Sequence, residues 1–369
     1  MLNYNITIFG GFKISFYRSF AEINLENLKN NVKNLYSFSK KKIFAVVKAD
    51  AYGHNAVLVS KYLQELDFIE SFCVATPLEG KELRENGIFK DILILGGVLK
   101  EEIEILNRYN LIPVISDFNQ LEIAKKLKNR KIHLKFDTGM RRLGFYLENV
   151  DKIKPLLKEF EIEGVLTHLS SADTDREYTI NQIKEFKEIL NLLDVKPKYI
   201  HVQNSAGVVY ECDFCSVIRV GLAMYGEKPF EDYPIKLKQV MSVKSKIISI
   251  KDVKTGDRVS YNGSFVAKKP MKVAIVPFGY ADGLPRSLSN RWFFLVNGKE
   301  APILGKITMD MTIVDVSEIE NINIGDEVVI IGESGDKRIT FGDIANIVGT
   351  ISYEIMCGIS KRVVRCEKC

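Results

Sequence analysis

The sequence predicts an α/β protein with two domains, an N-terminal (β/α)8 TIM-type barrel followed by an all-β C-terminal domain. In the first 222 residues, eight short apolar runs typical of buried strands alternate with segments of helical periodicity. Farther along the chain, strand-like runs follow one another with turn sequences between them. The length of 369 residues suits two domains of this kind.

Eight strands and the helices between them define the predicted barrel. The strands are expected at Phe44–Val47, Phe72–Ala75, Ile92–Leu95, Ile112–Ile115, Ile132–Phe136, Gly164–Thr167, Tyr199–Val202 and Val217–Val220. Helical periodicity marks Asn55–Leu66, Leu78–Asn86, Glu101–Arg108, Phe118–Leu127 and Thr179–Leu193. An open doubly wound sheet is the alternative. No Gly-x-Gly-x-x-Gly follows any of these strands, so a dinucleotide site has no support.

The C-terminal domain is expected over residues 235–369, the barrel over 18–234, and residues 1–17 form an extension without an assigned role. Turn sequences such as Asn297-Gly298 separate the strand-like runs of the second domain. These runs are Val240–Val253, Arg258–Phe265, Lys272–Phe278, Trp292–Val296, Met311–Val316 and Glu327–Ile331.

Charge and hydropathy exclude several classes of protein. The net charge of +5 is mild, and no Lys/Arg block is long enough to predict nucleic-acid binding. No apolar run approaches the roughly 18–20 residues of a transmembrane helix, and the N-terminus lacks the features of a signal peptide. We therefore expect a cytoplasmic protein that binds neither nucleic acid nor membrane.

Four of the six cysteines form two Cys-x-x-Cys pairs, Cys212/Cys215 and Cys366/Cys369. The pairs lie much farther apart in the sequence than the ligands of a zinc site usually do. In a cytosolic enzyme, reduced thiols are also favoured over disulfides. We therefore expect free cysteines and no metal site.

Polar residues gather where the barrel strands end. In such barrels, catalytic residues come from the C-terminal ends of several strands, and phosphate is often bound after strands seven and eight. The sequence places the following residues there: Lys48, Asp137, Arg142, His168, Asn204, Ser205, Arg219 and Gly221.

Lys48 follows four apolar residues that suit a buried strand, and small, turn-prone residues follow it. An ammonium held at such a strand end is partly desolvated, which lowers the pKa of a lysine and makes it a nucleophile for an aldehyde. By itself, this pattern is more typical of an ordinary surface lysine after an edge strand.

A longer motif around Lys48 favours the nucleophile over the ordinary surface lysine. Residues 45–54 read A-V-V-K-A-D-A-Y-G-H, which resembles the pyridoxal-phosphate (PLP) attachment motif of the alanine racemase family, PLP enzymes of fold type III. The resemblance extends from about Arg18 to Arg365. It includes K-F-D-T-G-M-R-R-L-G at 135–144, H-V-Q-N-S-A-G at 201–207, R-V-G-L-A-M-Y-G at 219–226 and V-S-Y at 259–261.

The resemblance implies a set of cofactor contacts. Lys48 would bind PLP covalently, Arg142 would contact its phenolic oxygen, and Arg219 its pyridine nitrogen. Lys135 would be carbamylated and would orient Arg142. The remaining implied cofactor residues are Tyr52, His168, Asn204, Ser205, Gly221, Leu222 and Tyr353.

The resemblance also implies a second base and a substrate site in the C-terminal domain. Tyr261 would be the base on the opposite face from Lys48, and it would enter the site from the partner subunit of a homodimer. Met309 and Asp310 lie in the substrate-carboxylate segment, and Tyr280 lies at the mouth of the site. The chain departs from the family at Asn262-Gly263 and at Thr308, where cysteine is frequent.

We therefore expect a two-base interconversion of L- and D-alanine that supplies D-alanine for peptidoglycan. A racemase for serine, or one of broad specificity, is the nearest alternative. A non-enzymatic PLP-handling protein on the same barrel would lack the large β-domain and Tyr261. A PLP decarboxylase of similar plan is disfavoured by Arg219 and by the motif around Lys48.

Overall fold

The computed structural model describes residues 17–368, which divide into two compact units. One unit is Leu28–Lys238, and the other combines the residues up to Asn27 with those from Gln239 onward. The segment that was expected to open the barrel thus groups with the C-terminal residues. The reason is β1 (Ser19–Ile23), which pairs with two strands of that unit. Except for Tyr17, the expected extension lies outside the described residues.

The first unit is the predicted barrel, and all eight of its predicted strands are confirmed. Neighbouring strands are parallel and follow the order β8-β7-β6-β5-β4-β3-β2-β9. Backbone hydrogen bonds from Ser216 N to Ile200 O and from Arg219 N to Gln203 O join the ends of this order. The strands are β2 (Lys42–Val46), β3 (Ile69–Val74), β4 (Asp91–Ile94), β5 (Ile112–Ile115), β6 (Lys131–Lys135), β7 (Glu161–Leu166), β8 (Tyr199–His201) and β9 (Val217–Val220).

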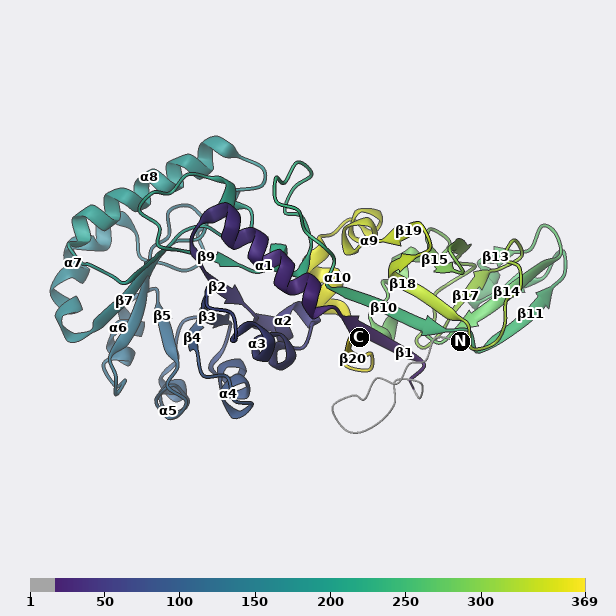
Figure 1. The fold of residues 1–369 in the computed structure, drawn as a ribbon, viewed down its shortest axis with the longest axis horizontal. Helices are drawn as coiled ribbons and strands as arrows, with labels where there is room; N and C mark the ends of the chain where they lie inside the picture. The colour runs from purple at the N-terminus through teal and green to yellow at the C-terminus, as the bar shows by residue number, and fades with distance from the viewer. Residues whose placement is uncertain (1–16, 369) are drawn as a thin grey trace. The chain divides into compact units, whose positions relative to one another are not determined.

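Helices lie around these strands (Figure 1). The helices are α1 (Leu25–Ser39), α2 (Lys48–Gly53), α3 (Ala56–Leu63), α4 (Pro77–Glu85), α5 (Ile103–Arg108), α6 (Phe118–Ala124), α7 (Val150–Ile153) and α8 (Arg176–Leu193). Several begin at side-chain caps: Asn55, Thr76, Asp117 and Asp175 each accept a hydrogen bond from a backbone N–H of the first turn. These caps fix where the helices start and, with them, where the preceding loops end.

The second unit is mostly β rather than all-β. Its largest sheet runs β16-β15-β18-β10-β1-β20, with β19 paired to β18, and smaller sheets are β11-β14-β17 and β12-β13. Its helices are α9 (Phe341–Val348) and α10 (Ser352–Gly358). Its other strands are β10 (Met241–Lys246), β11 (Ser249–Val253), β12 (Arg258–Val259), β13 (Phe265–Val266), β14 (Met271–Val276), β15 (Phe293–Val296), β16 (Lys299–Pro302), β17 (Thr312–Asp315), β18 (Glu327–Ser334), β19 (Lys337–Ile339) and β20 (Val364–Glu367).

One predicted strand, Arg258–Phe265, is interrupted. It consists of the short strands β12 and β13 and a 3₁₀ turn, Tyr261–Gly263, between them. Ser260 and Asn262 have φ values of 61° and 60°, outside the strand region. The interruption turns the Tyr261 side chain out of the ladder, and 65% of that residue is exposed.

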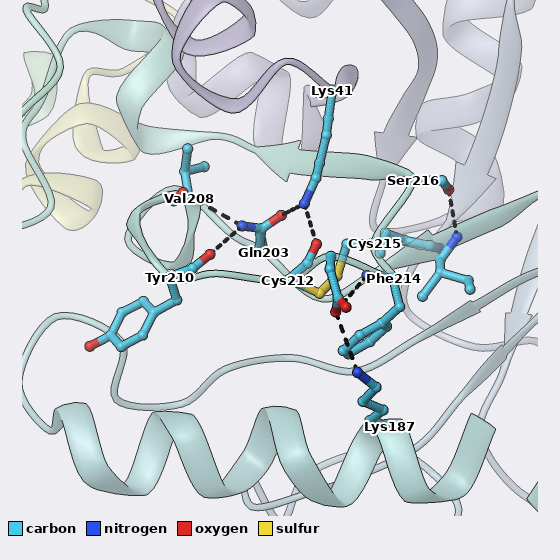
Figure 2. The surroundings of a disulfide bond; sticks show 12 residues. Lys41, Lys187, Gln203, Val208, Tyr210, Cys212, Phe214, Cys215 and Ser216 are labelled. Atoms are coloured by element: carbon cyan, nitrogen blue, oxygen red, sulfur yellow. Dashed lines mark hydrogen bonds and ion pairs between the residues drawn. A yellow bond between two sulfur atoms is a disulfide. The ribbon is translucent and has the colours of Figure 1, made fainter. Parts of the chain in front are cut away.

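The expectation of free cysteines is wrong for one pair. Cys212 and Cys215 form a disulfide in the loop between β8 and β9, with Cα atoms 5.4 Å apart, a separation that the bond requires (Figure 2). Lys41 Nζ donates to the carbonyl oxygen of Cys212 (2.6 Å) and to Gln203 Oε1 (2.9 Å) beside it. Cys73 is a buried free cysteine, and Cys369 lies outside the described residues.

Candidate active site

The barrel unit brings the predicted cofactor residues to the C-terminal ends of its strands. Their side chains are presented by loops and strand ends that the parallel ladder aligns at one end of the barrel. They are Lys48 directly after β2, Tyr52 in α2, Lys135 at the end of β6, Arg142 in the following loop, His168 after β7, Asn204 and Ser205 after β8, Arg219 within β9, and Gly221 and Leu222 after it.

Lys48 is followed by a turn of left-handed backbone. Residues 49–52 have φ values of 53° to 54° and ψ values of 40° to 50°, although none of them is glycine. Each L-residue in this region costs roughly 1–2 kcal/mol. Glu79 holds the start of the turn, because its two carboxylate oxygens accept from Ala49 N (2.8 Å) and Ala75 N (2.6 Å). The strain is therefore imposed by the fold directly beside the candidate nucleophile.

Sequence reasoning missed Glu79, although a signal was present. Thr76 and Glu79 form a capping box at the start of α4, in the spacing T-x-x-E that is typical of one. The pattern identifies the cap. It does not show that the second carboxylate oxygen reaches Ala49, which is 30 residues away in the sequence.

Arg219 is the buried centre of the site, with only 4% of the residue exposed. Its NH1 group donates to Nδ1 and to the carbonyl oxygen of His201, both at 3.0 Å. Its NH2 group donates to the carbonyl oxygen of Thr167 (3.0 Å) and to Nδ1 of His168 (3.2 Å). A guanidinium has five N–H donors, so these four bonds leave Nε–H for another acceptor.

The two histidines that face Arg219 are neutral. Burial, followed by the charge of Arg219, holds the pKa of His168 and that of His201 well below the ordinary value. Because arginine has no acceptor, the Nδ1 atom of each ring must accept, and the proton of each ring resides on Nε2. His168 is therefore a hydrogen-bond donor through Nε2.

Four cations lie within electrostatic reach of one another at this end of the barrel: Lys48, Lys135, Arg142 and Arg219. Burial, then the charges of Arg219 and Arg142, lower the pKa of Lys135 to about 8. Asp137 is the nearby carboxylate, but its oxygens accept from the backbone N–H groups of Gly139, Arg141 and Arg142 at 2.8–2.9 Å. Those bonds outweigh burial and lower the pKa of Asp137. The site thus carries an excess of positive charge that suits an anionic ligand.

Ser205, Gly221 and Tyr52 form a polar cradle at the end of β9. Ser205 Oγ accepts from Gly221 N (3.1 Å) and Ala223 N (3.2 Å). A Cβ at position 221 would lie 2.5 Å from the Tyr52 hydroxyl, so the close approach requires glycine. Asn204 fixes the same loop, because its Nδ2 donates to Leu169 O and its Oδ1 accepts from Gly207 N. These contacts place hydroxyl and backbone N–H groups together.

The second unit holds the remaining predicted site residues. The segments around Tyr280 and Met309 lie side by side, because Tyr280 N and Ala281 N donate to the carbonyl oxygens of Thr308 and Met309. Ser260, next to Tyr261, donates to Lys306 O at 2.6 Å. Tyr280 and Met309 are 42% and 53% exposed. Tyr353 lies in α10 of this unit and is 37% exposed.

Arg362, which was not predicted as a site residue, connects two segments of this surface. Arg362 forms ion pairs with Asp310 (2.8 Å) and with the buried Asp282 (3.3 Å). Asp282 in turn accepts from Gly279 N at 2.9 Å. The arginine thereby ties the segment of Tyr280 to that of Asp310. No pattern in the sequence singles out Arg362, because its partners come from distant segments.

Two family models match consecutive parts of the chain. The alanine racemase N-terminal domain matches residues 23–229, and the alanine racemase C-terminal domain matches residues 240–367. The chain belongs to the alanine racemase family. The enzymes of this family are amino-acid racemases, and the chain is an enzyme of that class.

Individual relatives match this chain over nearly its full length. The chain is 46% identical to the alanine racemase of Aquifex aeolicus, over 94% of this chain and 98% of that protein. The structure of alanine racemase from Clostridium difficile 630 is similar with a TM-score of 0.89 and 36% identity, covering 95% and 96% of the two chains. A structure of the Bartonella henselae alanine racemase with covalently bound pyridoxal phosphate has a TM-score of 0.87 and 28% identity, covering 95% of this chain and 100% of that one.

The barrel site fits the cofactor of this family. PLP carries a phosphate, a phenolic oxygen and a ring nitrogen, and the site offers a cation cluster, a polar cradle and the Nε–H of Arg219. Within residues 17–368, no cluster of three or more His, Cys, Asp or Glu residues could hold a metal ion. None of the described helices is long and apolar enough to cross a membrane.

Proposed function

We propose that the protein interconverts L- and D-alanine with PLP bound to Lys48. The observation that carries this proposal is the position of Lys48, directly before a strained turn and beside Lys135, Arg142 and Arg219 in a barrel of the alanine racemase family. PLP supplies an electron-withdrawing ring that acidifies the Cα–H bond of the bound amino acid. The product would be D-alanine for peptidoglycan, made in the cytoplasm.

The residues of the barrel unit would bind and orient the cofactor. Ser205, Tyr52 and the backbone of Gly221 and Leu222 would hold the phosphate, with support from Asn204 and from Tyr353 of the second unit. Arg219 would donate Nε–H to the ring nitrogen. A guanidinium cannot take a proton from that atom, so the nitrogen would stay unprotonated and the ring would be a weaker electron sink. That property limits side reactions such as transamination.

Racemisation requires a base on each face of the Cα atom. Lys48 would exchange the proton on one face and Tyr261 on the other. Tyr261 lies in an exposed turn of the second unit, which suits a residue that completes the site of a partner subunit. We therefore propose a homodimer with two shared sites, in which Tyr280, Met309 and Asp310 would contact the substrate.

Lys135 would act as a carbamate. The unmodified ammonium would be a like charge beside Arg142 and Arg219, whereas a carbamate would be an anion that orients Arg142. Carbamate formation requires the neutral amine, and the lowered pKa of about 8 makes that form accessible near neutral pH. Arg142 would contact both the cofactor's phenolic oxygen and the substrate carboxylate.

Two measurements test this function. The purified protein should be yellow, should form D-alanine from L-alanine, and should yield Lys48 as the PLP-labelled residue after borohydride reduction and peptide mapping. Lys48→Ala should abolish the label, while Lys41→Ala should keep it. A label on another lysine would reject the assignment of Lys48. A panel of amino acids, with serine first because Thr308 departs from the family, would separate a strict alanine enzyme from a broader one.

A further inference from the structure

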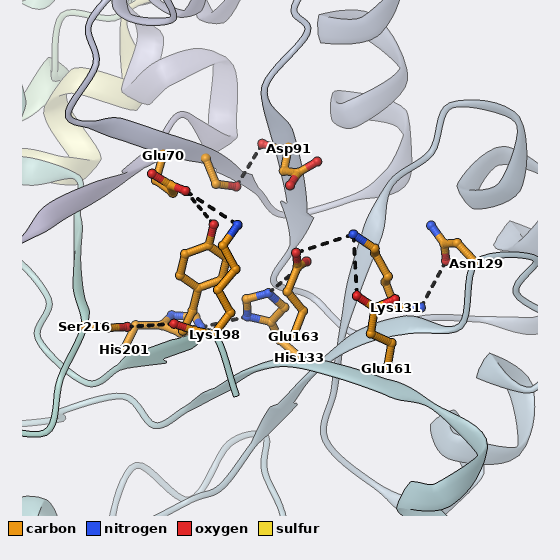
Figure 3. A network of polar contacts seen from close by, with 12 residues as sticks. Glu70, Asp91, Asn129, Lys131, His133, Glu161, Glu163, Lys198, His201 and Ser216 are labelled. Carbon is orange, nitrogen blue, oxygen red and sulfur yellow. Dashed lines mark hydrogen bonds and ion pairs between the residues drawn. The ribbon is translucent and has the colours of Figure 1, made fainter. Parts of the chain in front are cut away.

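A line of buried polar side chains runs from Arg219 through the interior of the barrel, away from the residues that would hold the cofactor. It passes from Arg219 on β9 to His201 on β8, then to His133 on β6 and to Glu163 on β7. Figure 3 shows His133 lying between His201 and Glu163. His133 and His201 are 0% exposed and Glu163 is 7% exposed. Barrel interiors are usually filled by branched apolar residues, so this line is an exception.

The direction of each hydrogen bond in this line follows from Arg219. The guanidinium donates to His201 Nδ1, so the proton of the neutral His201 ring lies on Nε2. That Nε2 atom is 2.9 Å from His133 Nδ1, which must therefore accept. Burial lowers the pKa of His133 below its ordinary value, so this ring is neutral as well. Its proton then lies on Nε2, at the far end of the ring.

The line ends on a carboxylate. His133 Nε2 lies 3.8 Å from Glu163 Oε2, and neither atom has a hydrogen-bond partner among the described residues. The contact with His133 is the largest influence on Glu163 and lowers the pKa of its carboxyl, which is therefore ionised. The other oxygen of Glu163 lies 3.6 Å from Lys131 Nζ at the surface. The negative end of the line thus lies opposite the positive Arg219.

The backbone makes room for this arrangement. Gly164 on β7 lies directly against the ring of His133, and a Cβ at that position would collide with Nδ1 and Cε1 of the imidazole. Phe44 packs against the rings of both His133 and His201, at centroid distances of 6.1 and 5.0 Å. The two rings are therefore confined in dry surroundings, where unmatched polar atoms are costly.

We infer that His133 and Glu163 are positioning residues for Arg219. They keep the unprotonated nitrogen of His201 turned toward the guanidinium, through a line of contacts that ends on the Glu163 carboxylate. If His133 carried its proton on Nδ1, that proton would face the Nε2–H of His201, and the hydrogen bond between the two rings would be lost. The consequence for catalysis rests on the proposed function, because it is Arg219 Nε–H that would face the cofactor ring.

The tautomers can be tested without reference to activity. The chain has four histidines, so the full-length protein labelled with ¹⁵N-histidine gives a simple spectrum. His133, His168 and His201 should carry their proton on Nε2. His54 should carry it on Nδ1, which lies 3.0 Å from the carbonyl oxygen of Ala51 and serves as an internal reference. A proton on Nδ1 of His133 or His201, or a doubly protonated ring, would overturn the inference.

The role of Glu163 is tested with three variants. Glu163→Met removes the acceptor and the charge, Glu163→Gln keeps an acceptor, and Glu161→Gln is the control because Glu161 also faces Lys131 but not His133. We expect Glu163→Met to shift the ¹⁵N signals of His133 and His201, and to weaken PLP binding and lower kcat by roughly 3- to 30-fold, with KM for alanine nearly unchanged. Glu163→Gln should recover most of the loss.

Equal ¹⁵N signals and equal PLP affinity in Glu163→Met and Glu161→Gln would reject the inference. If Glu163→Met does not fold, as judged by circular dichroism, Gly164→Ala displaces the His133 ring without altering any charge and should produce the same shifts in His201. Failure of the proposed function is distinguishable, because a protein that binds no PLP still reports the tautomers of its four histidines.

Discussion

At the scale of single residues, the structure separates the two candidate bases by their surroundings. Lys48 lies at the end of a buried strand, next to other cations, whereas Tyr261 lies in an exposed turn of the second unit. The position of Lys48 suits a lysine that would bind a cofactor in the barrel. The exposure of Tyr261 suits a phenol that would reach the site of a partner subunit. Each residue can therefore be tested by itself.

Tyr261→Phe should cripple racemisation while PLP stays bound. The substitution removes the hydroxyl that would exchange the proton on one face, and loss of a general base typically costs 10²–10⁴-fold in rate, so we expect a loss of about that size. Solvent deuterium exchange should become strongly unequal between L- and D-alanine. Tyr36→Phe, a partly exposed tyrosine of the barrel unit, is the control. Near-normal turnover in Tyr261→Phe would remove the residue from the mechanism.

Carbamylation of Lys135 should depend on pH in a defined direction. Because its pKa is lowered to about 8, the neutral amine should increase roughly tenfold between pH 7 and pH 9. After removal of CO₂, carbamate should thus return faster at pH 9 than at pH 7 at equal dissolved CO₂. The measurement is the ¹³C signal of protein exposed to labelled CO₂. The signal should vanish in Lys135→Gln, and its persistence there would assign it to another lysine.

At the scale of elements, the turn after Lys48 has the clearest energetic consequence. Ala49 is exposed and lies in the left-handed region with φ of 53°, so its methyl group contributes strain without packing. Ala49→Gly should stabilise the protein by about 0.5–1 kcal/mol after the entropy of glycine is subtracted. Urea unfolding measures the change. Ala124→Gly, in the right-handed helix α6, should instead destabilise it, and equal effects of the two changes would contradict the strained turn.

The elements also show why some features were predictable and others were not. Most residues of the eight barrel strands are apolar, and burial on both faces of a parallel strand produces that pattern directly. The left-handed turn is not encoded in Ala49–Tyr52, since distant carboxylates such as Glu79 impose it. The interruption at Tyr261 and the position of β1 likewise depend on partners far away in the sequence. The site residues were found through motifs, whereas Glu79, Arg362, His133 and Glu163 function through contacts that no local pattern reveals.

At the scale of the whole molecule, the proposed division of the site predicts complementation. Inactive Lys48→Ala and Tyr261→Phe chains should regain activity when they are mixed and allowed to exchange subunits. In each mixed dimer, one site would combine the native Lys48 with the native Tyr261, while the other would carry both changes. If both residues came from one chain, every site would remain singly defective. Demonstrated exchange without recovered activity would therefore rule out shared sites.

The place of β1 has a consequence for the order in which the chain can fold during synthesis. β1 is the first of the described strands to leave the ribosome, yet its neighbours in the sheet are β10 and β20, and β20 ends at Glu367. All strands of the barrel lie between Lys42 and Val220, so the barrel can form while the ribosome is still translating the rest. Throughout that interval β1 lacks its partner strands, and a chain that terminates before Val364 leaves β1 as an exposed edge open to aggregation.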